Sequence, residues 1–159
     1  MIETHLTRDL REYLRERLAD GRLPLKSGGT RAPAIVNGYL PPKRTKETDD
    51  FPFVLVRADR GETSPDATTV SVSIIVGVYS EDFDAHDICL SVMAKIRQAL
   101  YDLPCGTLSE RYQFRPGFSW ENFPEQGWPY WQLDIKTEWL LVAPEIAPAE
   151  YTILGGFDG

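Results

Sequence analysis

Side chains that commonly carry out chemistry are scarce in this sequence, which has two cysteines and two histidines. His86 and Cys89 stand three residues apart in a segment predicted to be helical, so they share a helix face and could ligate one metal ion. A zinc site needs two further ligands, and Cys105 is the only other soft donor. A cysteine in the apolar stripe of a helix explains Cys89 without any metal. We therefore predict no metal site and no cofactor.

Catalytic arrangements are equally poorly supported. Cys89 and His86 would point side by side from one helix, and no third residue is placed to orient the histidine. The sequence has no G-x-S-x-G elbow, no P-loop and no G-x-G-x-x-G fingerprint. Acidic residues at 81, 82, 84 and 87 surround a predicted helix start, where the helix dipole favours carboxylates. The sequence thus predicts a protein that is not an enzyme, with a hydrolase using Cys89 or these acidic residues as a minor alternative.

Aromatic side chains are concentrated in residues 111–131, which hold 8 of the 18 in the chain. Flat rings in one segment could stack on bases or sugars. No basic residue lies among the five rings from Trp120 to Trp131, and the nearest charges are Glu121 and Glu125, which argues against single-stranded nucleic acid. These rings could instead complete the core or fill a subunit interface. The rings closest together are those of Trp120, Phe123, Trp128, Tyr130 and Trp131.

Length and charge define the broad class. The chain has 159 residues, of which 42% are hydrophobic and 26% charged, with a net charge of −7. These values are typical of one globular domain and exclude a disordered chain. Residues 1–60 carry 12 basic and 9 acidic side chains, whereas residues 61–159 carry 5 and 15. Because an acidic surface repels phosphate, we expect no tight sequence-specific binding of DNA or RNA. The same acidity is compatible with a surface that DNA passes without adhering or simply with solubility, and composition does not choose between the two. No apolar run is long enough for a membrane helix and the start lacks a secretory signal, which predicts synthesis in the cytoplasm.

Two amphipathic helices are predicted. In residues 2–20 a leucine or isoleucine recurs at every fourth position, which is typical of a helix that packs on one side. Residues 84–103 show a second stripe, and Asp84 is its candidate N-cap. The second stripe consists of Ile88, Val92, Ile96, Leu100 and Leu103.

Five strands are predicted, at residues 34–40, 53–58, 69–79, 113–115 and 130–141. The clearest is 69–79, whose β-branched residues alternate and place Val72, Ile74 and Val76 beneath the helices. Residues 59–68 are interpreted as a polar hairpin arm, and Pro116-Gly117 is expected to end a strand. Residues 22–33 and 43–50 are interpreted as loops.

The last predicted strand separates its side chains into two sets. Core-facing residues are Trp131, Leu133, Ile135, Trp139 and Leu141, and water-facing residues are Gln132, Asp134, Lys136 and Glu138.

The predicted fold class is α+β. A mostly antiparallel or mixed sheet of four to five strands carries two amphipathic helices, in the order α-β-β-β-α-β-β. We predict that residues 1–142 form a single domain and that residues 143–159 form a C-terminal extension that docks on a neighbouring subunit or partner. The alternatives are docking in a groove of its own domain and a frayed terminus. The extension is rich in Pro and Gly yet includes Tyr151 and Phe157, which are unusually apolar for a free end.

Three stretches carry a resemblance to a known family. They are FPFVLVRADRGE at 51–62, TVSVSIIVGVYSEDFDAHDICLSVMAKIRQAL at 69–100 and ENFPEQGWPYWQLDIKTEWLL at 121–141. In this order they resemble the tail terminator (tail completion) proteins of long-tailed bacteriophages, over most of residues 1–142. The loop at 43–50 and the end of the chain have no counterpart in the resemblance.

The resemblance implies a virion structural protein that forms a ring, usually of six subunits, on the finished tail tube. Such a ring ends polymerisation of the tail tube protein and gives head-completion and connector proteins a docking face, while DNA passes through its lumen. The alternative is a module that binds a small ligand or peptide through residues 118–131. We expect contacts with other subunits or partners at Arg57, Asp59, Arg60, Glu62, Trp120, Glu125, Trp128, Tyr151 and Phe157.

Overall fold

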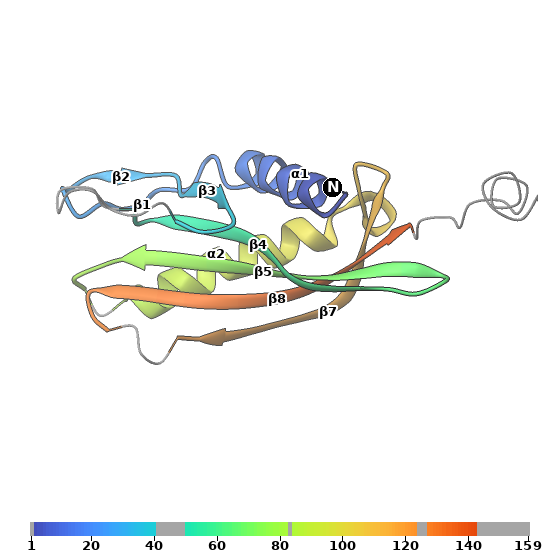
Figure 1. Cartoon of the computed structure of the whole chain (residues 1–159). Coiled ribbons are helices and arrows are strands. Elements are labelled where there is room, and N and C mark those ends of the chain that lie inside the picture. Colours follow the sequence, from blue (N-terminus) through green and yellow to red (C-terminus); the bar gives the residue numbers. More distant parts are fainter. Residues whose placement is uncertain (1, 41–49, 83, 124–126, 143–159) are drawn as a thin grey trace, which may run out of the picture.

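The computed structural model describes residues 2–40, 50–82, 84–123 and 127–142 of the chain. Figure 1 shows two layers, in which both helices lie on one face of a long sheet. The large sheet has six strands in the order β3-β4-β5-β8-β7-β6, and a small separate sheet joins β1 to β2. The fold is therefore α+β, as the sequence predicts.

The helices and strands are regular, and most of the connections between them are short. In chain order they are α1 Ile2–Arg17, β1 Leu23–Pro24, β2 Thr30–Arg31, β3 Ala34–Asn37, β4 Phe53–Thr63, β5 Ala67–Tyr79, α2 Ala85–Tyr101, a 3-10 turn Pro104–Gly106, β6 Thr107–Leu108, β7 Tyr112–Asn122 and β8 Tyr130–Val142. Strand β3 runs parallel to β4, whereas the other neighbours in the large sheet pair antiparallel. The sixth strand, β6, has two residues and no periodicity by which it could be predicted.

Helix α1 forms because its leucines recur once per turn and all reach the same apolar layer. Leu6, Leu10 and Leu14 are fully buried, as the spacing predicts. The Tyr13 hydroxyl donates a hydrogen bond of 2.6 Å to the carbonyl oxygen of Ala99, near the end of α2. The two helices are thus tied to each other as well as to the sheet.

Helix α2 buries a wider stripe than the sequence predicts. Its buried set adds Ala85, Cys89, Met93 and Ala99 to the predicted residues, whereas Ile88 is only partly buried. Asp84 occupies the N-cap position, but its side chain does not cap the helix. Its Oδ1 instead accepts a hydrogen bond of 3.0 Å from the Ser80 hydroxyl, which holds the turn between β5 and α2.

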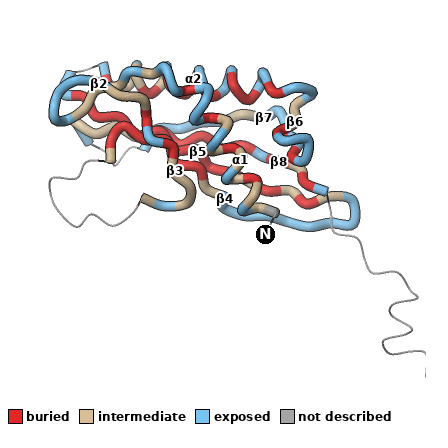
Figure 2. The backbone as a smooth tube through the Cα atoms, turned by 90° about the horizontal axis from the view of Figure 1, so that it is seen from above, coloured by how far each residue is buried: buried red, intermediate tan, exposed pale blue. Residues whose placement is uncertain are grey.

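Strand β5 is the centre of the core and confirms the predicted alternation. Val72, Ile74 and Val76 are fully buried beneath the helices. Figure 2 shows long buried stretches on β5 and its neighbour β8. On the opposite face, Gly77 leaves room for the ring of Phe53, which a Cβ at that position would overlap.

A second, smaller apolar cluster covers one end of the helix-free face. It consists of Phe51, Phe53, Leu55, Ile75 and Tyr79, with Leu40 and Tyr130 packed against it.

Three local predictions need correction. The predicted hairpin arm at 59–68 is present, but the strands reach further into it than predicted, because β4 continues to Thr63 and β5 begins at Ala67, where it also pairs with β8. Strand β7 does not end at Pro116, because a bulge between Arg115 and Ser119 absorbs the Pro-Gly pair. Residues 22–33, interpreted as loop, contain the β1–β2 pair.

Candidate assembly surfaces

The helix-free face of the sheet carries a polar cluster at its centre. It lies where residues of β4, β5 and β8 oppose one another: Arg57 opposes Ser73, and Ser73 opposes Lys136. Asp59 sits in a bulge of β4 between Ala58 and Arg60, which turns its carboxylate toward Ser73. Two of the predicted interaction residues, Arg57 and Asp59, therefore belong to an internal network.

The hydrogen bonds of this cluster converge on Asp59. Arg57 Nε donates to its Oδ1 at 3.0 Å, and Lys136 Nζ donates to its Oδ2 at 3.3 Å. The Ser73 hydroxyl also donates to Asp59, while Lys136 Nζ lies 2.6 Å from Ser73 Oγ and 3.1 Å from Asp134 Oδ2. Asp134, predicted to face water, lies on this face but is only 7% exposed, and it is paired with Lys136.

The protonation of the cluster is set by these contacts. Burial alone would raise the pKa of Asp59, but hydrogen bonds from Ser73, Arg57 and Lys136 hold that pKa below its usual range. Burial alone would lower the pKa of Lys136, yet its hydrogen bond and charge interaction with Asp134, and those with Asp59, raise it. Lys136 thus keeps its proton and is no general base for Ser73, which is itself fully buried. The cluster braces the bulge of β4 rather than forming a Ser–Lys nucleophile.

A shallow groove of about 340 Å³ lies beside the cluster on the helix-free face. Arg60 and Ser71 line it from one side, and Gly117 and Ser119 from the other. The bulges of β4 and β7 therefore flank the groove from the two sides of the sheet centre. Its walls hold the exposed Arg60, which makes no ion pair with a residue that the structure describes.

Both long edges of the sheet extend beyond their outer partners. Strand β3 pairs with β4 only at 53–56, so 57–63 have no outer partner among the described residues. Strand β6 pairs with β7 only at 112 and 113, which leaves 114–122 without an outer partner in the described part of the chain. Free edges of seven and nine residues are natural sites for pairing with another chain.

The aromatic residues of 118–131 do not gather into one site. Trp120 and Trp128 are 41% and 56% exposed, but the Trp128 indole N–H donates a 3.0 Å hydrogen bond to the carbonyl oxygen of Glu81. Tyr130 belongs instead to the aromatic cluster of the helix-free face, where its ring centroid lies 4.8 Å from that of Phe51. Glu125, Tyr151 and Phe157, also predicted to make contacts, lie outside the described residues.

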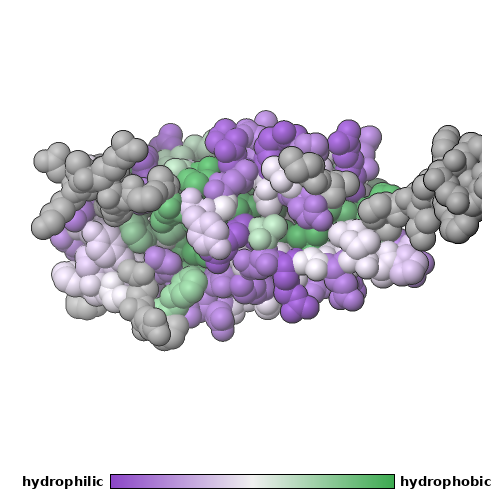
Figure 3. Space-filling model, in the orientation of Figure 1, coloured by the Kyte–Doolittle hydropathy of each residue, from purple (hydrophilic) through white to green (hydrophobic). Residues whose placement is uncertain are grey.

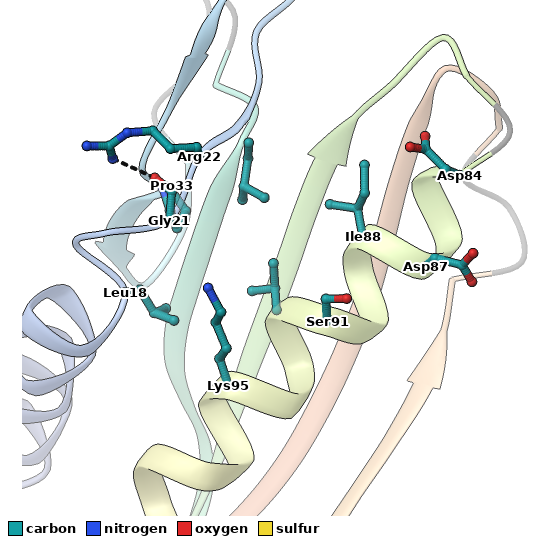
Figure 4. Close-up of a pocket in the computed structure, with 11 residues that line it drawn as sticks. Leu18, Gly21, Arg22, Pro33, Asp84, Asp87, Ile88, Ser91 and Lys95 are labelled. Atoms are coloured by element: carbon teal, nitrogen blue, oxygen red, sulfur yellow. Dashed lines mark hydrogen bonds between the residues drawn. The ribbon is translucent and has the colours of Figure 1, made fainter.

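A pocket of about 270 Å³ separates the end of α1 from the start of α2 (Figure 4). Its apolar lining includes Leu18, Leu23 and Ile88. Arg22, Asp87 and Lys95 add charges of both signs to the lining. Sequence reasoning missed it because its lining comes from three separate segments. In the view of Figure 3, the surface over α1 is mainly hydrophilic, and apolar patches lie below it.

Of the two cysteines, Cys89 is buried and Cys105 is exposed. Burial raises the pKa of Cys89 to about 12, so its thiol stays protonated at neutral pH. Its Sγ faces the carbonyl oxygen of Trp131 at 3.8 Å, inside the core. Among residues 2–40, 50–82, 84–123 and 127–142, no group of three or more His, Cys, Asp or Glu could hold a metal ion.

Comparison with known proteins adds no family to these observations. No protein-family model matches the sequence, and no curated protein matches it either. No helix in the described part of the chain is long and apolar enough to cross a membrane.

Proposed function

We propose that this protein is a tail terminator of a long-tailed bacteriophage. Copies of the chain assemble into a ring of six at the head-proximal end of the tail, stop growth of the tail tube and offer a face to the head connector. The protein is made in the host cytoplasm and carried in the virion. Its action is steric and needs no catalytic residue.

The observation that carries this proposal is the arrangement of the three resembling stretches. They supply β4, then β5 with α2, and then β8 with the end of β7. These strands are direct neighbours in the sheet, and α2 packs on β5 and β8. The resemblance therefore covers one contiguous structural unit, rather than scattered segments.

The charge distribution supports the same proposal. The net charge of −7 makes specific adhesion of DNA unfavourable, which suits a protein that surrounds a DNA channel. The alternative, a module that binds ligand through residues 118–131, is less favoured. The Trp128 indole is hydrogen-bonded to the carbonyl oxygen of Glu81, and Tyr130 packs in the aromatic cluster of the helix-free face. Neither ring lines the pocket between α1 and α2 or the groove beside the Asp59 cluster.

The test is a tube-elongation assay with the tail tube protein of the same phage. Purified full-length chain is added at increasing molar ratio while tubes polymerise, and tube lengths are measured by electron microscopy. We expect shorter tubes whose growth does not resume when more tube protein is added. Unchanged lengths at saturating chain would refute the proposed function.

A further inference from the structure

We infer that copies of this chain join edge to edge, with residues 60–63 of β4 in one copy pairing antiparallel with residues 118–121 of β7 in the next. This inference rests on the proposed ring, and it names the two surfaces that close it. The pairing places Arg60 opposite Glu121 and Gly61 opposite Trp120. Glu62 then opposes Ser119, and Thr63 opposes Phe118.

Strand direction makes this joint possible without rearranging either copy. Strands β4, β5, β8 and β7 alternate in direction, because each neighbouring pair is antiparallel. A second copy placed beside the first in the same orientation therefore presents β7 antiparallel to β4, and its helices stay on the same side of the extended sheet. Such a head-to-tail contact uses different surfaces on each copy and closes into a ring when the rotation between copies permits. A two-fold pairing of one edge with itself would leave the other edge free.

On the helix-bearing side, the two edges complement each other in size. The β4 edge offers exposed small residues there, Gly61 and Thr63, which share a face with the buried Val70 and Thr68 that they oppose. The β7 edge offers Trp120, which opposes the buried Ile135 yet is 41% exposed. Placing Trp120 over Gly61 of the next copy would cover a large aromatic surface where no side chain competes for the space.

On the helix-free side, the two edges complement each other in charge. Glu121 lies opposite Asp134 on β8, so two carboxylates face each other across strands at the β7 edge. Neither Glu121 nor Arg60 makes an ion pair with any residue in the described ranges. The proposed joint brings Arg60 of one copy beside Glu121 of the next and offsets that excess negative charge.

The register of the proposed β4–β7 pairing is fixed by the same charged residues, Arg60 and Glu121. Sliding β7 by two positions in one direction sets Glu62 opposite Glu121, which places like charges together. Sliding it in the other direction moves Arg60 away from Glu121 and sets Ser119 opposite it. Pro116 lacks an N–H donor, so pairing further along β7 toward its start is also disfavoured.

Disulfide trapping of the full chain tests this joint. In a Cys105→Ser background, where the remaining Cys89 is buried, Glu62→Cys is mixed with a size-tagged Ser119→Cys protein and oxidised. We expect the tagged heterodimer in several-fold higher yield than with the controls, which replace Ser119→Cys by Glu121→Cys, two residues along the same edge, or by Glu138→Cys on β8. A yield no higher than that of the Glu138→Cys control would overturn the inference.

Charge exchange tests the register independently. Arg60→Glu and Glu121→Arg should each lower the yield of the 62–119 cross-link several-fold, whereas the two changes together in one chain should restore it. Failure of the double variant to recover would overturn the proposed register.

The outcomes also separate this inference from the proposed function. Tube capping without the 62–119 cross-link would leave the function standing and overturn the joint. Cross-linking without any effect on tube length would support the joint and refute the function.

Discussion

Asp59 is the carboxylate most directly tied to the fold at the scale of single residues, because Arg57, Ser73 and Lys136 all hydrogen-bond to it. Its pKa in the folded protein lies below the ordinary value of 3.8. The stability that this lowered pKa contributes is therefore complete above about pH 4 and is lost as the pH falls through the folded pKa. The carboxylate therefore braces the β4 bulge at neutral pH and down to about pH 4, and loses this role as it becomes protonated at lower pH.

Replacing Asp59 by Asn should reveal this linkage. We expect Asp59→Asn to lower the free energy of unfolding at pH 7, and the difference from the unchanged protein to shrink at pH 3. Urea denaturation at the two pH values measures it, with Asp66→Asn in the exposed β4–β5 turn as the control. A difference that is as large at pH 3 as at pH 7 would contradict the role of the charged carboxylate.

Val76 tests the core at the same scale. Its side chain is fully buried under the helices, so Val76→Asp would place an unpaired carboxylate in an apolar layer. We expect the variant to lose soluble expression. Val142→Asp is the matched control, since Val142 is 77% exposed at the end of β8. A folded Val76→Asp protein with an ordinary melting temperature would show that the face of β5 is wrongly assigned.

At the scale of elements, the free edge of β4 is expected to serve assembly rather than folding. Arg60 and Glu62 are exposed and lie beyond the reach of β3. Reversing both charges in one chain (Arg60→Glu with Glu62→Arg) should change the melting temperature by only a few degrees, as for other surface substitutions. Assembly should fail, because Glu at position 60 would then face Glu121 of the next copy. Tubes capped at normal length by this variant would exclude the β4 edge as a docking element.

Elements could be predicted where the sequence pattern that indicates them lies within one segment. The leucine ladder of α1 and the alternation of β5 are repeated patterns within one segment, and the structure confirms both. The full length of β4 could not be read from the sequence, because residues 59–63 are polar or glycine and exposed, and pairing with β5 rather than burial holds them in the sheet. Strand β7 continues past Pro116 because a bulge accommodates this residue. Since a bulge depends on pairing with the partner strand, it could not be predicted from the sequence of β7 alone.

The candidate surfaces could likewise be predicted only where the signal lies in the residue itself or in its own segment. The exposure of Arg60 and Glu62 follows from their charge, and the structure confirms it. The cluster around Asp59 could not be predicted, since Ser73 and Lys136 join it from strands 14 and 77 residues away. The pocket beside Lys95 likewise depends on how α1 and α2 pack against each other.

At the scale of the whole molecule, the docking of residues 143–159 on a neighbour remains a prediction, because these residues lie outside the described part of the chain. They contain Ile146, Tyr151, Ile153, Leu154 and Phe157. Burying a large apolar side chain contributes about 1.5–3 kcal/mol, so three of them could offset the entropy lost on docking. Truncation after Val142 should leave the melting temperature of the domain unchanged and weaken assembly, as measured by sedimentation velocity. Assembly by the truncated chain equal to that of the full chain would show that the extension does not clasp a neighbour.

Under the proposed function, copies of this chain close into a ring that caps a tube. Negative-stain electron microscopy of the full-length chain, alone and mixed with polymerised tail tubes, tests it most directly. We expect closed rings of one size, about six copies as the resemblance to tail terminators implies, either free or seated at one end of each tube; a head-to-tail contact can close into such a ring. Compact monomers or two-fold dimers in both samples, with bare tube ends, would contradict it.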